Sequence, residues 1–184
     1  MKTASILAGA ALAALASTAV LAQTPQGTPD VRTFGDFQVR CFQVQGGSPC
    51  DMFEQVRNRD TGQPLINFSI AFLPANNRYV MVLGVPLGVS LAAGAVIQTN
   101  TFATPVMKFR RCDRAGCYVE AAVEKPLIDA FMKSSGEGKL RLTADGEDKA
   151  REFPISFNGF NAAHDNMVES NRSRSKPAAA PAAP

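Results

Sequence analysis

Short runs in which apolar and polar residues alternate make up most of the chain, and they constrain its fold more than any other feature. In the run 35–44, Phe37, Val39 and Cys41 share one side while the residues between them are mostly polar. A period of two is the pattern of a β-strand with one buried face. Similar runs recur between turn-forming residues about every eight to twelve positions, which is typical of a β-sandwich or barrel. We therefore expect an all-β domain, with a sandwich as the first choice.

The alternating pattern predicts eight or nine strands and one or two short helices. The expected strands are residues 35–44, 50–58, 65–74, 78–86, 95–102, 104–112, 117–124, 138–146 and 151–160. Helical spacing of apolar residues is confined to 125–135 and 161–170, where Pro126 stands at a position typical of a first helical turn. Pro154 cannot donate a ladder hydrogen bond, so the last strand is expected at an edge or a bulge.

The first 22 residues have the layout of a secretory signal peptide. Lys2 precedes an uncharged run rich in Ala and Leu, and the run ends at Ala22. We expect cleavage after Ala22 and a soluble protein that stays in the periplasm or is secreted. The alternative is an uncleaved N-terminal anchor. No stretch after Ala22 is apolar and long enough to cross a membrane, so no span is expected in the mature chain.

Composition divides the mature chain into three parts. Residues 23–33 are rich in Pro, Gly and Thr and are expected to form a flexible lead. Residues 34–170 form the predicted β-domain. Residues 171–184 are a basic, Pro/Ala-rich segment that is expected to be a disordered tail.

The four cysteines, Cys41, Cys50, Cys112 and Cys117, all follow the leader. An even number in an oxidising compartment indicates two disulfides, for which three pairings exist. The spacing favours Cys41–Cys50 and Cys112–Cys117, each across a turn. A zinc site is disfavoured because the spacing within the first pair is too wide, and thiol redox chemistry is disfavoured because no C-x-x-C occurs.

Charge argues against a nucleic-acid partner. The chain has 19 Lys and Arg against 16 Asp and Glu. Lys2 lies in the leader, and Arg172, Arg174 and Lys176 lie in the tail, so the folded body is close to neutral. Because phosphate contacts supply most of the affinity for duplexes, a body of this kind lacks the positive excess that nucleic-acid binding needs.

The sequence contains no recognisable catalytic or cofactor-binding motif. We therefore expect that the protein is not an enzyme and binds no metal or cofactor. The single histidine, His164, is followed by Asp165, but adjacent helical residues do not face each other. A catalytic His164 is therefore not expected, and the simple interpretation is an exposed surface histidine. No G-x-S-x-G, P-loop or G-x-G-x-x-G occurs. A hydrolase that uses carboxylates in a sandwich cleft is kept as an alternative.

The segment 108–120 combines two cysteines with four basic side chains: Lys108, Arg110, Arg111 and Arg114. It predicts a disulfide-pinned hairpin in which Glu120 pairs across the strands with Lys108 or Arg110. The simple interpretation is a hairpin with a charged solvent face. The sharper hypothesis is a docking site for an anionic partner, whether lipid headgroups, a polysaccharide or an acidic protein.

Several sequence motifs and their order along the chain resemble those of the invasion-associated locus B family of alphaproteobacterial exported proteins. They are F-x-V-x-C at 37–41, the P-L-G turn at 86–88, F-R-R-C-D-R-A-G-C at 109–117 and the closing N-G-F at 158–160. Phe37 stands where members often carry tryptophan. The resemblance covers about residues 34–168.

The resemblance implies an immunoglobulin-like β-sandwich in the periplasm or cell envelope. The family is linked to host-cell invasion without a defined enzymatic activity, and the cysteines carry over as bridges. We expect a binding or scaffold module that acts through an unknown envelope or host protein. The alternative is a secreted or surface virulence-associated factor that contacts host cells.

Overall fold

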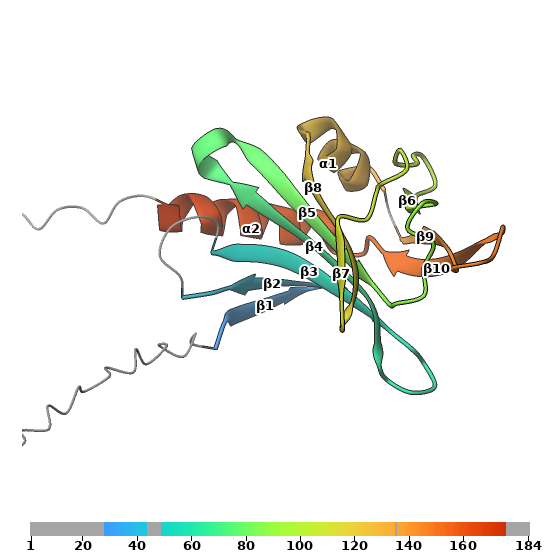
Figure 1. Ribbon diagram of the computed structural model, residues 1–184. Coiled ribbons are helices and arrows are strands. Elements are labelled where there is room, and N and C mark those ends of the chain that lie inside the picture. Colours follow the sequence, from blue (N-terminus) through green and yellow to red (C-terminus); the bar gives the residue numbers. More distant parts are fainter. Residues whose placement is uncertain (1–27, 44–48, 135, 176–184) are drawn as a thin grey trace, which may run out of the picture.

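A large antiparallel sheet forms the body of the protein (Figure 1). The computed structural model describes residues 28–43, 49–134 and 136–175. The strand order of this sheet is β1-β2-β3-β4-β5-β8-β7. In chain order the strands are β1 (Asp30–Phe34), β2 (Phe37–Cys41), β3 (Cys50–Arg57), β4 (Pro64–Leu73), β5 (Arg78–Val85), β7 (Arg111–Asp113) and β8 (Gly116–Val123).

A second, three-stranded antiparallel sheet lies beside the first and has the order β10-β9-β6. Its strands are β6 (Ala95–Gln98), β9 (Glu137–Thr143) and β10 (Ala150–Ser156). The helices are α1 (Lys125–Met132) and α2 (Phe160–Ser175), with a 3-10 turn η1 (Pro74–Asn76) between β4 and β5. Figure 1 shows α2 along one face of the large sheet, with α1 and the small sheet toward the other end.

Alternation along the central strands divides the large sheet into a buried face and a half-exposed face. On β4, Ile66, Phe68, Ile70 and Phe72 are buried while the residues between them are half-exposed. The buried face packs against α2, whose Phe160 ring lies edge-on to that of Phe37. Such edge-to-face aromatic pairs add to the free energy gained by burying the rings. We call the opposite side of β3, β4, β5 and β8 the open face.

The predicted all-β, sandwich-like class is confirmed, with two antiparallel sheets and two helices. Pro154 does lie on an edge strand, since β10 is the first strand of the small sheet. The prediction of a long strand over residues 104–112 was wrong. The strand in this region is β7, which has three residues and begins at Arg111.

Both ends of the folded body extend beyond the predicted boundaries. β1 begins at Asp30, inside the expected flexible lead, and pairs with β2 over its whole length. At the other end, α2 continues to Ser175, and Asn171 is fully buried. The Asn171 side chain exchanges two hydrogen bonds with the backbone of Cys50, at 3.0 and 2.8 Å. The leader 1–22 and the end of the tail, 176–184, lie outside the described residues.

Candidate functional site

The β7–β8 hairpin is pinned by a disulfide between the directly opposed Cys112 and Cys117. The other disulfide joins Cys41 and Cys50, which face each other on β2 and β3. The pairing is therefore the local one that the spacing favours. Each bridge fixes the register of two neighbouring strands beside a turn.

Within the hairpin, Arg111 is held in place by its neighbours. Its Nε donates to Glu120 Oε1 at 2.8 Å, and its Nη1 donates to Asp113 Oδ2 at 2.6 Å. The guanidinium also lies over the ring of Tyr118, 4.1 Å from the centroid, a favourable cation–π geometry. The hydrogen bond to Glu120 raises the pKa of Arg111 further above its ordinary range. Arg111 therefore organises the hairpin rather than offering a free charge.

The other three predicted docking residues are less engaged. Arg110 shares Glu120 at a longer distance of 3.5 Å, and its side chain is 72% exposed. Lys108 and Arg114 are exposed and make no ion pair within the described part of the chain. The predicted pairing of Glu120 with Arg110 is present, whereas Lys108 takes no part in it. The hairpin thus keeps two cations without a carboxylate partner.

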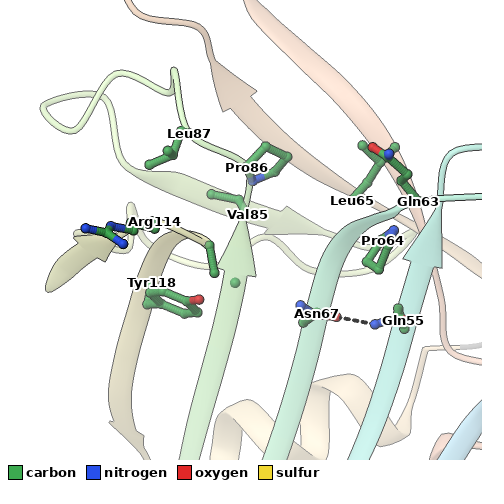
Figure 2. Close-up of a pocket in the computed structure, with 12 residues that line it drawn as sticks. Gln55, Gln63, Pro64, Leu65, Asn67, Val85, Pro86, Leu87, Arg114 and Tyr118 are labelled. Carbon is green, nitrogen blue, oxygen red and sulfur yellow. Dashed lines mark hydrogen bonds between the residues drawn. The ribbon is translucent and has the colours of Figure 1, made fainter. Parts of the chain in front are cut away.

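A pocket of about 640 Å³ lies beside the hairpin on the open face (Figure 2). We call it the open-face pocket. Arg114 and Tyr118 line one side, and Gln55 and Asn67 line the other, joined by a 2.8 Å hydrogen bond. The remaining lining residues are Gln63, Pro64, Leu65, Gly84, Val85, Pro86, Leu87 and Ala115.

Glycine at position 84 is needed for the shape of this pocket. A Cβ at Gly84 would lie 3.2 Å from Cε1 of Tyr118, so the ring lies close against the strand because no side chain intervenes. The lining combines apolar walls with carboxamide and guanidinium donors, and no acidic side chain is among the described residues that line it. Such a surface suits a ligand with an apolar part and an anionic or hydrogen-bond-accepting group.

A second pocket, of about 420 Å³, lies where β3 of the large sheet meets β10 of the small one. We call it the acidic pocket because Asp36, Glu54 and Glu137 all line it. Glu54 is 5% exposed, and its Oε1 accepts a 2.8 Å hydrogen bond from the backbone N–H of Ser156.

Glu54 is the site residue that the sequence analysis missed. Burial raises the pKa of Glu54 from 4.5 to about 7; the hydrogen bond from Ser156 opposes this rise and the Asp36 carboxylate adds to it. The signal was present in the alternation of β3, which places Glu54 in register with the buried Met52. A carboxylate at an inward position of a strand indicates either a hydrogen-bonding partner inside the fold or a functional site.

The expectation of an exposed His164 was wrong. The side chain is buried, its Nε2 lies 3.0 Å from the hydroxyl of Tyr79, and its Nδ1 lies 3.0 Å from Oδ1 of the adjacent Asp165. Asp165 is thus close enough to accept a hydrogen bond from Nδ1–H, which leaves Nε2 to accept one from the Tyr79 hydroxyl. This chain of hydrogen bonds anchors α2 to β5 in the core.

The described residues contain neither a metal-binding cluster of side chains nor a helix that could span a membrane. No group of three or more His, Cys, Asp or Glu side chains there is arranged to hold a metal ion. Among the helices in the same residues, none combines the length and the apolar character that a membrane span requires.

The fold and its pockets define a class of protein: a small, mostly β, disulfide-pinned domain with a polar pocket beside a basic hairpin. The sequence matches the family described as "Invasion associated locus B (IalB) protein" over residues 37–168. The chain therefore belongs to this family, and the resemblance inferred from its motifs is confirmed.

Relatives agree with this assignment, and a solved structure shares the fold. The chain is 28% identical over 150 residues to a protein named invasion protein B homolog from Brucella abortus strain 2308, and equally to one from biovar 1 strain 9-941. Each alignment covers 81% of this chain and 86% of the relative. The crystal structure of invasion associated protein B from Bartonella henselae shares the fold, with a TM-score of 0.67 at 21% identity, over 77% of this chain and 98% of that chain.

Proposed function

We propose that this protein is exported, loses its leader after Ala22, and works in the periplasm or cell envelope as a binding or scaffold module without catalytic activity. The observation that carries the proposal is that Arg114, a cation with no ion-pair partner among the described residues, lines a pocket whose described lining residues include no acid. Lys108 lies on the approach to the hairpin, and Arg114 at its tip lines the open-face pocket. This arrangement supports docking of an anionic group of an envelope partner.

The four predicted docking residues differ in how far their charges are already engaged by neighbouring side chains. Arg111 is committed to Glu120, Asp113 and the Tyr118 ring, so its replacement would disturb the hairpin itself. Arg114 and Lys108 can be replaced without breaking an ion pair between described residues. They are therefore the residues with which to test docking.

The test is cross-linking in living cells with the protein tagged after Ala22, captured under denaturing conditions and its partner identified by mass spectrometry. A Lys108→Ser/Arg114→Ser variant is compared with a control that removes two exposed cations elsewhere, Lys133→Ser/Arg78→Ser. We expect one envelope partner to be lost in the first variant and kept in the control. A partner kept in both would contradict docking at the hairpin, and capture of no partner would contradict the binding module.

A second candidate function is that of a secreted or surface factor that contacts host cells. It is supported by the names of the relatives, which describe invasion proteins. Protease treatment of intact cells separates the two. Digestion of the protein on intact cells would favour the surface role, and complete protection would contradict it.

A third candidate, a hydrolase using carboxylates, is favoured by the presence of Asp36 and Glu54 in one pocket. Turnover of envelope glycans or peptides by the purified protein, abolished in Glu54→Gln, would establish this role in place of the binding module.

A further inference from the structure

The acidic pocket gathers three carboxylates and no compensating cation. Its lining is Asp36, Glu54, Gln55, Val56, Gly136, Glu137, Pro154, Ile155, Ser156 and Asn158. No ion pair joins any of the three acids to a basic side chain within the described residues. Because like charges close together repel each other, an arrangement of this kind is stabilised by a cation that enters the pocket.

Glu54 forms the buried wall of the pocket, and one of its oxygens has no partner. Its Oε1 accepts from Ser156, but Oε2 is buried and has no hydrogen-bond partner in the described part of the chain. Burying a carboxylate oxygen without a hydrogen-bond partner costs more free energy than burying a neutral polar atom in the same way. The reason is that an ionised group loses a larger hydration free energy. This unmet acceptor lies in a residue that lines an open cavity.

Asp36 and Glu137 form the exposed rim and also have acceptor capacity to spare. The hydroxyl of Ser156 donates to Asp36 Oδ2 at 2.6 Å, and the Asn158 amide donates to the same oxygen at 3.4 Å. Both donors are neutral, so the charge of Asp36 is not compensated. Glu137 lies opposite Ser156 on β9, where its exposed side chain makes no ion pair with a described residue.

The spacing of these groups favours an organic cation over a metal ion. Coordination needs several ligands within about 2–2.6 Å of one point, and the described residues contain no such group of acids. A guanidinium binds best to both oxygens of one carboxylate, whereas Glu54 and Asp36 each have one oxygen already engaged. An ammonium group has three diverging donors and can bond to separate carboxylates. Val56 and Pro154 supply apolar lining for an alkyl stem.

We propose that the acidic pocket binds a primary ammonium group carried on an alkyl stem, with Glu54 and Asp36, which both bond to Ser156, as its acceptors and Glu137 as a further negative charge at the rim. This site is separate from the basic hairpin and does not depend on the docking role proposed for it. The ammonium comes either from a free polyamine or from a lysine side chain of a protein. Both sources present the same group to the pocket.

The affinity should depend on pH through Glu54. Burial raises its pKa to about 7, so Glu54 is increasingly neutral below that value and attracts a cation less. The other charged groups that line the pocket are Asp36, from the turn between β1 and β2, and Glu137, from β9. The lining residues on β10, Pro154, Ile155 and Ser156, carry no charge. Binding is therefore expected to weaken as the pH falls from 8 to 6.

The test is an NMR titration of the full-length chain, expressed with its leader, purified after export and labelled with 13C at the Glu and Asp side chains. The probe is n-butylammonium chloride at constant ionic strength. We expect the carboxyl signals of Glu54 and Asp36 to move saturably, and the pKa of Glu54 to fall toward its ordinary value when the probe is bound. Glu54→Gln keeps an acceptor for Ser156 but removes the charge, and should weaken binding at pH 8 by about tenfold or more.

Controls decide between recognition and simple charge screening. Glu169→Gln removes an exposed acid on α2 and should leave the affinity unchanged. Tetramethylammonium has no N–H donor, so equal binding of that ion would overturn the proposal. No saturable shift with n-butylammonium, or the same shift in Glu54→Gln, would overturn it too, as would displacement of the probe by equimolar Ca²⁺ or Mg²⁺.

Tighter binding of putrescine than of N-acetyl-lysine amide supports a free polyamine as the source, and the reverse order supports a lysine side chain.

Discussion

Glu54 on β3 accepts a 2.8 Å hydrogen bond from the backbone N–H of Ser156 on β10, and this contact joins the two sheets across 102 positions of sequence. The cost of this contact is the burial of a carboxylate, which raises the pKa of Glu54 to about 7. The contact between the sheets and the unusual titration are therefore two consequences of one side chain.

The stability of the protein should fall as the pH rises from about 4.5 to about 7. In the folded state Glu54 keeps its proton up to about pH 7, whereas in the unfolded state it loses it near 4.5. The folded state binds more protons in this window, so raising the pH favours unfolding. The contribution amounts to roughly 3 kcal/mol, since one pKa unit corresponds to about 1.4 kcal/mol. This destabilisation by Glu54 is fully present above pH 7 and disappears below pH 4.5.

Glu54→Gln tests this linkage directly. Urea unfolding at pH 8 should show the variant to be more stable than the original by up to about 3 kcal/mol, and the difference should become small at pH 4.5. Glu169→Gln, an exposed acid on α2, should change stability little at either pH. An equal effect of Glu54→Gln at both pH values would show that its charge is not the cause.

Asn171 anchors the end of α2 to the first residue of β3. Its amide donates to the backbone carbonyl of Cys50 and accepts from the N–H of the same residue. Because each such bond is worth about 0.5–1.5 kcal/mol net, Asn171→Ala should lower the free energy of unfolding by roughly 1–3 kcal/mol. Asn161→Ala, at an exposed position of the same helix, serves as the control. Chemical denaturation of both variants makes the comparison, and equal effects would refute the anchoring role.

How much the sequence predicts depends on whether burial leaves a pattern in it. β4 and β5 could be predicted because one face of each is in the core, so apolar residues recur with a period of two. β1 could not, since its residues are nearly all exposed and it is held by backbone pairing with β2. In the run 104–112, Pro105 has no N–H for a ladder, and between Pro105 and the start of β7 the pairing is reduced to an isolated bridge at Met107.

The same distinction holds for the candidate site. The hairpin could be predicted because its cysteines and charges are neighbours in sequence. The acidic pocket could not, since Asp36, Glu54 and Glu137 come from three distant segments that only the packing of the two sheets brings together. For His164, the rule that adjacent helical residues point apart failed because Nδ1, the ring nitrogen nearest the backbone, needs little reach to meet Asp165.

Tyr79 and Tyr118 are the two tyrosines of the chain, and their hydroxyls should differ in importance. The hydroxyl of Tyr79 is buried against His164 Nε2 at 3.0 Å, whereas that of Tyr118 is near Asp113 at 3.4 Å on the surface. Tyr79→Phe leaves a buried nitrogen without its donor and should cost about 1–3 kcal/mol. Tyr118→Phe should cost less than about 0.5 kcal/mol, as surface substitutions usually do. Thermal unfolding of the two variants checks the order, and an equal loss would contradict it.

Gly84→Ala should reshape the open-face pocket through Tyr118. The new Cβ would lie 3.2 Å from ring atom Cε1, closer than most side chains tolerate, so the ring must shift away from the strand. The expected cost is about 1–3 kcal/mol, as for other insertions into packed sites. In a Tyr118→Ala background the same substitution should cost much less, because the two residues are in contact and their effects are not additive. Tyrosine ring signals in NMR spectra would report the displacement, and an unchanged Tyr118 signal together with additive stability effects would contradict the close packing of these two residues.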